Sequence, residues 1–276
     1  MYRIIKFALA APGPRCVQGW RVKGRSQGGE RPWAMSLYRT LAVSNHPLAR
    51  ALRSFRRGIF QFGIPAPRVL FLPILYLVLG IKESWYFLYR VFLCEPLFKM
   101  QCRSYGKNLH TGPFLNEVWG KGDIEVGDNV LVDGKCIFFF AVRFCERPFL
   151  KVGDNSGLGH NCTFFIGKSI TIGKHCRMGT DITMLDSPGH PLDPQRRMAG
   201  EAPDIENVRP ITIGDNVWIG TGSVILPGVN IGDNSVISLG SVVMSDVPAN
   251  VVVAGNPARK ILSLEAKPTE KAVAGV

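Results

Sequence analysis

One histidine of this chain has a setting suited to proton transfer. His190 stands between Gly189 and Pro191 in a long polar segment, residues 185–210, that separates two strongly patterned stretches of sequence. Proline fixes its own φ and restricts the residue before it, so the backbone at His190 should be stiff. A neutral imidazole can take the proton of an attacking alcohol near pH 7. His190 is therefore a candidate general base, and a solvated loop histidine is the alternative.

The stretches around this segment repeat with a step of six residues. Large aliphatic side chains recur at one set of positions, and smaller residues fall midway between them. The aliphatic positions are Ile213, Ile219, Ile225, Ile231, Ile237 and Val243, and the midway positions are Val217, Ser223, Val229, Ser235, Ser241 and Val247. A helix repeats about every 3.6 residues and a strand about every two, so neither has this period.

A step of six fits a short strand followed by a turn, and three such steps make a triangular coil of about 18 residues. Stacked coils satisfy the backbone through parallel ladders, which places Ile213 over Ile231 and Ile219 over Ile237 at roughly 4.8 Å. Earlier coils follow the steps Val126–Val132–Phe138, Val152–Leu158–Phe164 and Ile172–Met178–Met184. The sequence therefore predicts an all-β solenoid over residues 120–262, with residues 185–210 as a protruding catalytic loop.

Three longer motifs accompany the repeat. They are Gly189-His-Pro-Leu-Asp193, Arg209-Pro-Ile-Thr-Ile-Gly-Asp-Asn-Val-Trp-Ile-Gly220 and Val252-Val-Ala-Gly-Asn-Pro-Ala-Arg-Lys-Ile261. Together with the hexapeptides they resemble the hexapeptide-repeat acyltransferase superfamily, in its maltose and galactoside O-acetyltransferase branch, with exopolysaccharide enzymes of the colanic-acid type as relatives. The resemblance implies a left-handed parallel β-helix, a homotrimer, and direct transfer of an acetyl group from acetyl-CoA to a sugar hydroxyl in a ternary complex. His190 is the general base that it implies.

The resemblance also assigns donor and acceptor contacts. The positions where this branch contacts CoA, between neighbouring subunits of the trimer, are Gly179, Trp218, Gly220, Ser223, Gly240 and Arg259. Gly159 and Gly167 stand where the branch carries its acceptor-binding Asn and Asp, which leaves as candidate acceptor contacts Asn161, Asp181 and Asp193. Met244-Ser245 replace the usual Thr-Lys, which removes a cation for a phosphate. The sugar, its hydroxyl group and the acyl chain length stay open.

Three other functions are compatible with the same fold. They are N-acylation of an amino sugar by the same base, a non-catalytic scaffold for assembly or binding, and a zinc enzyme like the γ-class carbonic anhydrases. The zinc enzyme needs three converging histidines, and His160, His175 and His190 lack the H-x4-H spacing of that class. We expect no metal, because buried thiols and corner histidines account for His160-Asn-Cys162 and His175-Cys176.

Residues 35–119 should form a helical and apolar region. Residues 36–60 predict a helix with a basic face, which carries Arg39, Arg50, Arg53, Arg56 and Arg57. The apolar stretch 69–81 is shorter than the about 20 residues of a membrane span, because Lys82 and Glu83 end it. With residues 85–93 it would form either a hairpin in a membrane interface, with the arginines on lipid phosphates, or a helix pair packed on the solenoid or a partner subunit. The first alternative favours a lipid-linked glycan acceptor and a cytoplasmic enzyme at the inner face of the membrane.

The charge of the chain is unevenly distributed. Of a net charge of +12, residues 1–34 supply +6, and we interpret them as a basic tail, a targeting segment or sequence upstream of a start at Met35. Residues 263–276 are expected to be a second tail. Because the solenoid has no basic stripe, we predict no binding to nucleic acid. The seven cysteines are odd in number and contain no C-x-x-C pair, which argues against a disulfide framework or a zinc ribbon and fits a reducing cytosol.

Overall fold

The computed structural model describes residues 43–264, so the predicted tail 1–34 and most of the tail 263–276 lie outside the described residues. The chain divides into two units, residues 1–67 and 68–276. The described part of the first unit contains α2 (Pro47–Gln61), which occupies much of the predicted basic helix. Its first turn is capped by His46, whose Nδ1 accepts the Leu48 N–H at 3.3 Å.

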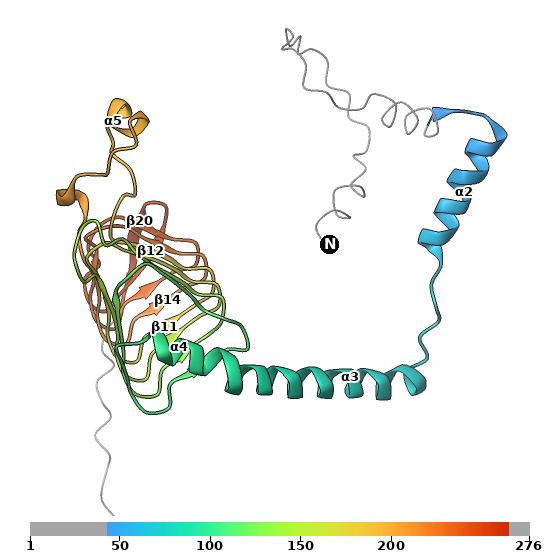
Figure 1. The fold of residues 1–276 in the computed structure, drawn as a ribbon, viewed down its shortest axis with the longest axis horizontal. Helices are drawn as coiled ribbons and strands as arrows, with labels where there is room; N and C mark the ends of the chain where they lie inside the picture. The colour runs from blue at the N-terminus through green and yellow to red at the C-terminus, as the bar shows by residue number, and fades with distance from the viewer. Residues whose placement is uncertain (1–42, 265–276) are drawn as a thin grey trace, which may run out of the picture. The chain divides into compact units, whose positions relative to one another are not determined.

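The second unit is built on a parallel β-helix of three sheets (Figure 1). The first sheet contains β1 (Ser104–Tyr105), β4 (Asp123–Val126), β7 (Phe149–Val152), β10 (Ser169–Ile172), β13 (Ile211–Ile213) and β16 (Asn230–Ile231). The second contains β2 (His110–Thr111), β5 (Leu131–Val132), β8 (Gly157–Leu158), β11 (Arg177–Met178), β14 (Trp218–Ile219), β17 (Val236–Ile237), β19 (Val251–Gly255) and β20 (Ala258–Ser263). The third contains β3 (Glu117–Trp119), β6 (Ile137–Phe140), β9 (Thr163–Ile166), β12 (Thr183–Leu185), β15 (Val224–Ile225) and β18 (Val242–Val243).

The chain passes from the first sheet to the second, then to the third, and back to the first, so each coil has three corners. We call the turn between the first and second sheets the first corner, as at residues 127–130. The second corner joins the second and third sheets, as at residues 133–136. The third corner leads back to the first sheet, as at residues 141–148.

The register of the solenoid is the one that the hexapeptide step predicts. Ile213 pairs with Ile231 in the first sheet, and Ile219 with Ile237 in the second. Ile225 lies beside Val243 in the third sheet, and all of these aliphatic side chains are buried. The midway positions are buried as well, including three serines whose small side chains fit the narrow corners. The predicted left-handed β-helix is therefore confirmed.

A first, irregular coil precedes the predicted start of the solenoid at residue 120. Strands β1 to β3 occupy residues 104–119, and Thr111 of β2 pairs with Val132 of β5. Thr111 is buried at the place where later coils carry an aliphatic residue. The hexapeptide pattern therefore does not reveal this coil.

Asparagines stabilise the first corner of successive coils. Asn129 and Asn155 adopt the left-handed conformation with φ of 54° and 59°, which asparagine tolerates better than most residues. The amide of Asn129 also donates to Asn155 Oδ1 at 3.1 Å, and that of Asn216 donates to Asn234 Oδ1 at 2.9 Å. His175 takes the same position between these pairs with a φ of 58°. These corners thus join coil to coil through side chains as well as through the backbone.

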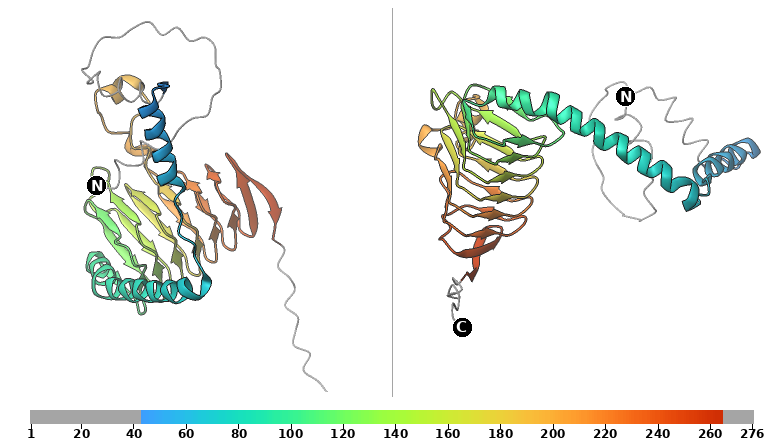
Figure 2. Two further views of the ribbon diagram at one scale, coloured as in Figure 1. Left: turned by 90° about the vertical axis from the view of Figure 1, so that its right-hand side faces the viewer. Right: turned by 90° about the horizontal axis from the view of Figure 1, so that it is seen from below.

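The region before the solenoid is one long helix. Helix α3 (Arg68–Tyr89) continues through a π-helical turn (Arg90–Cys94) into α4 (Glu95–Gln101), so the predicted hairpin is wrong (Figure 2). Residues 82–84 are tolerated in helices and contain neither glycine nor proline, so nothing there turns the chain. No residue of α3 is buried, so the predicted packing of an apolar helix pair on the solenoid is also wrong. Near the C-terminal end of α3, the Tyr86 ring lies 5.9 Å from that of Phe114.

Helix α4, by contrast, covers the first end of the solenoid core. Phe98 of α4 is 2% exposed, and its ring lies 5.7 Å from that of Phe138. Phe138 in turn stacks on Phe164 of the next coil, with centroids 5.1 Å apart and planes 5° apart. At the other end, β20 pairs with β19 in antiparallel fashion. The core is therefore continuous from α4 through the coils.

Candidate active site

The predicted loop leaves the solenoid at the third corner, between β12 and β13, and Asp186 anchors its root. The Asp186 side chain is fully buried, and its carboxylate accepts the N–H groups of Gly167 at 2.6 Å, Lys168 at 2.7 Å and Ser169 at 2.9 Å. The Asp186 carbonyl accepts the N–H of Arg209, where the loop returns, at 2.8 Å. One residue thus joins both ends of the loop to the preceding coil.

Burial raises the pKa of Asp186, and the three N–H donors act in the opposite direction. Sequence reasoning did not single out this residue. The available signal was its position directly after β12, the last strand before the repeat is interrupted. An exposed turn residue without a carboxylate would also fit the sequence pattern at that position. Its burial and its three donors become visible only when the previous coil is in place.

The tip of the loop is a small structure of its own. Asp193, a predicted acceptor contact, caps α5 (Pro194–Met198) because its Oδ1 accepts the Arg196 N–H at 2.8 Å. Arg196 forms ion pairs of 2.8 Å with both Glu201 and Asp204. A short 3-10 helix, Ile205–Asn207, follows before the chain returns to β13. These contacts give Asp193 a structural role within the loop.

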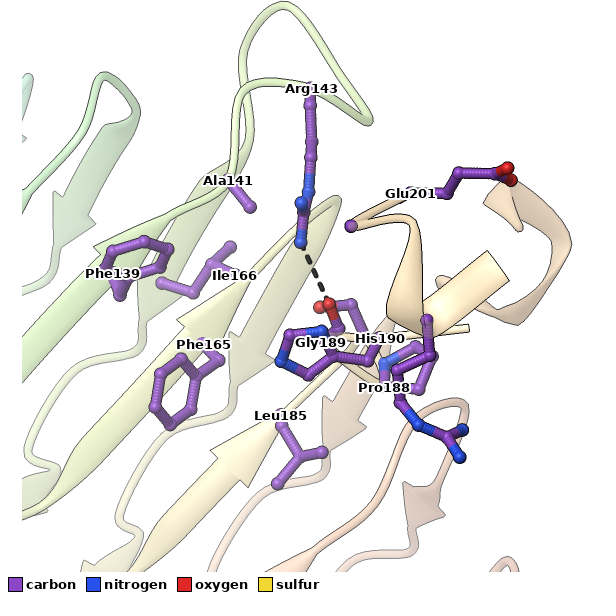
Figure 3. Close-up of a pocket in the computed structure, with 13 residues that line it drawn as sticks. Phe139, Ala141, Arg143, Phe165, Ile166, Leu185, Pro188, Gly189, His190 and Glu201 are labelled. Carbon is purple, nitrogen blue, oxygen red and sulfur yellow. Dashed lines mark hydrogen bonds between the residues drawn. The ribbon is translucent and has the colours of Figure 1, made fainter. Parts of the chain in front are cut away.

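His190 lies on this loop beside the outer face of the third sheet. Its N–H donates to the Pro188 carbonyl at 2.8 Å, and the Arg143 guanidinium donates to the Gly189 carbonyl at 3.1 Å (Figure 3). The imidazole points toward Phe165 in this view. Within residues 43–264, no hydrogen bond or ion pair involves a ring nitrogen of His190. Both ring nitrogens are therefore available to a substrate.

A pocket of about 450 Å³ opens in front of His190, a size typical of small-molecule sites. Its wall on the solenoid comes from the outer side of three neighbouring coils, which contribute Phe139, Phe165 and Leu185, and its other wall is the loop. Phe139 and Phe165 lie 6.0 Å apart on that outer side. The full lining is Phe139, Ala141, Arg143, Phe165, Ile166, Leu185, Ser187, Pro188, Gly189, His190, Arg197, Gly200 and Glu201. Only His190 among these residues was predicted, although outward-facing aromatics at equivalent positions of two coils were a usable signal.

The other predicted contacts gather mainly at the second corner, which is a different edge of the solenoid. Asn161 and Asp181 both adopt left-handed backbone conformations there, and the Asn161 amide donates to Asp181 Oδ1 at 2.6 Å. The predicted CoA-contacting glycines Gly179, Gly220 and Gly240 lie at this corner as well. One chain therefore does not bring these positions together with His190.

Three of the predicted CoA contacts have distinct surroundings. Ser223 is fully buried, and its hydroxyl donates to the Ser238 carbonyl at 3.1 Å, so its side chain is occupied inside the coil. Trp218 is 59% exposed on the outer side of the second sheet. Arg259 lies in β20, and its guanidinium donates to the Ala258 carbonyl at 2.9 Å. The side chains of Trp218 and Arg259 can thus reach a ligand, whereas Ser223 is enclosed, with its carbonyl accepting the Thr183 N–H at 3.0 Å.

Histidines and thiols do not form a metal site in the part of the chain that the structure describes. Among residues 43–264, no group of three or more His, Cys, Asp or Glu side chains is placed to hold an ion. His160, His175 and His190 lie at the second, first and third corners, respectively, so they do not converge within one chain.

Comparison with known sequences gives a consistent set of relatives. Residues 210–244 match the bacterial transferase hexapeptide (six repeats) family, and residues 150–181 match the hexapeptide repeat of succinyl-transferase. A Saccharomyces cerevisiae protein described as an acetyltransferase is 46% identical over 141 residues, which covers 49% of this chain and 68% of that protein. Galactoside O-acetyltransferase of Escherichia coli is 40% identical over 136 residues, which covers 49% of this chain and 62% of the enzyme.

Two further comparisons extend this set. Nodulation protein L of Rhizobium meliloti is 43% identical over 116 residues, covering 42% of this chain and 61% of that protein. Among solved structures, the N-acyltransferase AntD of Bacillus cereus, in complex with dTDP and 3-hydroxybutyryl-CoA, has a TM-score of 0.51 and 21% sequence identity, covering 62% of this chain and 88% of that chain. The likeness to AntD shows the fold alone. For the Escherichia coli and Rhizobium proteins, the match spans about three fifths of their length.

Proposed function

This chain belongs to the hexapeptide-repeat acetyltransferases, and we propose that it transfers an acetyl group from acetyl-CoA to a hydroxyl group of a sugar or glycan precursor. The observation that carries the proposal is the position of His190, held on an anchored loop with its ring nitrogens open to a pocket of about 450 Å³. The identity to a galactoside O-acetyltransferase supports the hydroxyl as the acceptor group.

In the proposed reaction His190 acts as the general base. The neutral imidazole takes the proton of the acceptor hydroxyl while the hydroxyl oxygen attacks the thioester carbon. The new C–O bond replaces the C–S bond, the CoA sulfur leaves with the bonding electron pair, and His190 returns the proton to that sulfur. Direct transfer requires the two substrates and His190 together, which gives the loop anchor at Asp186 a role in positioning.

We also propose a homotrimer, because the predicted contacts are divided between two edges of one chain. His190 lies at the third corner, and the second corner carries most of the predicted CoA positions. A neighbouring subunit that presents its second corner to the loop would complete the site. Trp218 and Arg259 would then be available from that neighbour for the adenine and a phosphate of CoA.

The pocket wall supports a sugar as the acceptor. Phe139 and Phe165 place aromatic rings beside His190, and an apolar ring surface packs well against the C–H groups of a pyranose. Arg143 and Glu201 supply polar groups at the rim. An aromatic wall with few polar groups at its edge is typical of sites that fix the orientation of a small ligand.

The experiment is turnover of acetyl-CoA, followed as release of free thiol, against free, nucleotide-linked and lipid-linked sugars and their amino-sugar counterparts. We expect turnover with a hydroxyl acceptor, and replacing His190→Ala should lower kcat by about 10²- to 10⁴-fold, as for loss of a general base. The control is His175→Asn, since Asn occupies the same position in neighbouring coils. Near-normal turnover by His190→Ala, with the trimer intact in light scattering, would contradict the assignment. Acetylation of amino groups alone would replace the O-acyl proposal with N-acylation.

A further inference from the structure

Helix α3 exposes an apolar surface that nothing in the described chain covers. Its 22 residues span about 33 Å at 1.5 Å per residue, and the continuous helix from Arg68 to Gln101 is long and apolar enough to cross a membrane by length and composition. The exposed apolar residues are Val69, Leu70, Phe71, Leu72, Ile74, Leu75, Tyr76, Leu77, Val78, Leu79, Ile81, Trp85, Phe87 and Leu88.

The distribution of these residues indicates what covers them. They occupy consecutive positions from 69 to 79 apart from Pro73, so they lie on every side of the helix and not along one stripe. A single partner helix or a second copy of the chain covers one stripe, whereas a helix that is apolar all round requires an apolar medium. Pro73 and Gly80 in its interior fit the same reading, because both residues are more frequent in membrane helices than in soluble ones.

The ends of α3 have the side chains expected at a lipid–water boundary. Arg68 begins the helix, and Arg90 follows it directly. Trp85 near its C-terminal end is 63% exposed, and amphipathic aromatic rings are enriched at the level of lipid headgroups. Inside α3, Lys82 Nζ lies 3.9 Å from Glu83 Oε1, so the two charges that follow the apolar stretch are paired.

Helix α2 is amphipathic and strongly basic. Its apolar stripe, at helical spacing, consists of Leu48, Leu52, Phe55 and Ile59, each more than half exposed. Arg50 and Arg57 are exposed on the side opposite this stripe and Arg56 is exposed at its edge, and the helix contains no acidic residue. This combination of apolar stripe and arginines fits the surface of a bilayer that contains anionic lipid.

We propose that α2 and α3 together anchor this enzyme to a phospholipid bilayer. Helix α3 embeds in the hydrocarbon region, and α2 lies on the surface with its arginines near the phosphates of anionic lipids. The anchor would hold the catalytic pocket close to acceptors that are themselves attached to lipid. This last consequence rests on the proposed function, but the anchor itself does not.

The test is flotation of the purified full chain with vesicles of phosphatidylcholine alone and with vesicles that also contain phosphatidylglycerol. We expect the chain to float with both, and more tightly with the anionic vesicles. Reversing three charges of α2 (R50E, R56E, R57E) should weaken binding to anionic vesicles by about 100-fold. This total corresponds to a loss of roughly tenfold or less for each arginine that is reversed. The matched control reverses three exposed lysines of the solenoid unit (K107E, K121E, K151E) and should change binding little.

Helix α3 is tested separately by L72D with L75D, two exposed positions where the change does not disturb a core. This variant should lose flotation with both kinds of vesicle and keep its far-UV circular dichroism. A wild-type chain that stays unbound with both kinds of vesicle overturns the proposal. The proposal is also overturned if the solenoid control (K107E, K121E, K151E) loses as much binding to anionic vesicles as the α2 variant. If the wild-type chain stays unbound while L72D with L75D lowers its oligomeric state, a second copy covers α3 instead. Because binding is measured without turnover, failure of the anchor and failure of the acetyltransferase proposal are distinguishable.

Discussion

Replacing the buried carboxylate at the loop root should damage both stability and turnover. Asp186→Ala removes the acceptor for three N–H groups of the preceding coil. Asp186→Asn keeps the shape and one acceptor oxygen but turns an NH₂ group toward those donors. We expect the alanine variant to lose more stability than the asparagine variant, and both to position His190 less well.

The magnitude follows from the exposure of the three donors. The Gly167 N–H is buried, so leaving it without a partner costs about 1–3 kcal/mol, whereas Lys168 and Ser169 are half-buried and water can replace part of their bonds at about 0.5–1 kcal/mol each. Burial of the Asp186 carboxylate is itself unfavourable, so its removal offsets some of this loss of unfolding free energy. The net loss for Asp186→Ala should therefore be about 2–3 kcal/mol.

The assay combines urea unfolding with steady-state acetyl transfer. We expect kcat to fall by about 10- to 100-fold, because misplacement of a catalytic group by about 1 Å has effects of this size. The KM for acetyl-CoA should change less, since the predicted CoA positions lie at another corner. The control is Asp215→Ala, in which an exposed corner carboxylate that accepts the Lys174 N–H at 2.7 Å is removed far from the loop. Wild-type stability and kcat in Asp186→Ala would refute the proposed anchor.

Two further predictions concern the coils themselves. Gly220→Ala should destabilise the solenoid by about 1–3 kcal/mol in urea unfolding, because a Cβ there would lie 2.5 Å from the Leu239 nitrogen, and an unchanged midpoint would contradict the required close approach. The Asp128 N–H and the Lys174 ammonium lower the pKa of Asp154, so the stability that Asp154 contributes is present above pH 3.8 and is lost as the pH falls through its lower folded pKa. Asp154→Asn should flatten the acid limb of a plot of unfolding free energy against pH, and an identical acid limb would show that these contacts do not stabilise the fold.

The coils were predictable because their signal is local and periodic. The inward positions from Ile213 to Val243 follow one another at intervals of six residues. Because each coil has the same pattern of inward aliphatic residues as the coil before it, both the register and the burial follow from the sequence. The location of His190 in the candidate site was predictable for a different reason: the motif around it and the break in the repeat coincide. Where regular coils end, a functional loop is a reasonable expectation.

The remaining features depend on contacts between distant residues. Phe139 and Arg143 approach His190 only because successive coils stack, and the outward-facing Phe139 is by itself a weak signal of a pocket. The anchoring role of Asp186 likewise requires the turn at Gly167. The continuity of α3 was missed because Lys82 and Glu83 interrupt the apolar pattern. Charged residues end an apolar stretch, but lysine and glutamate are good helix formers and do not end a helix.

The two closed ends of the solenoid bear on its solubility. Every coil is a template for the next, and an open end would present unpaired N–H and C=O groups to any other chain, which is how fibrils elongate. Phe98 and α4 block such growth at one end, and the antiparallel β20, running against the direction of all other strands, blocks the second sheet at the other. These two elements limit such growth, so truncation before residue 258 should expose the edge of the second sheet and favour filaments.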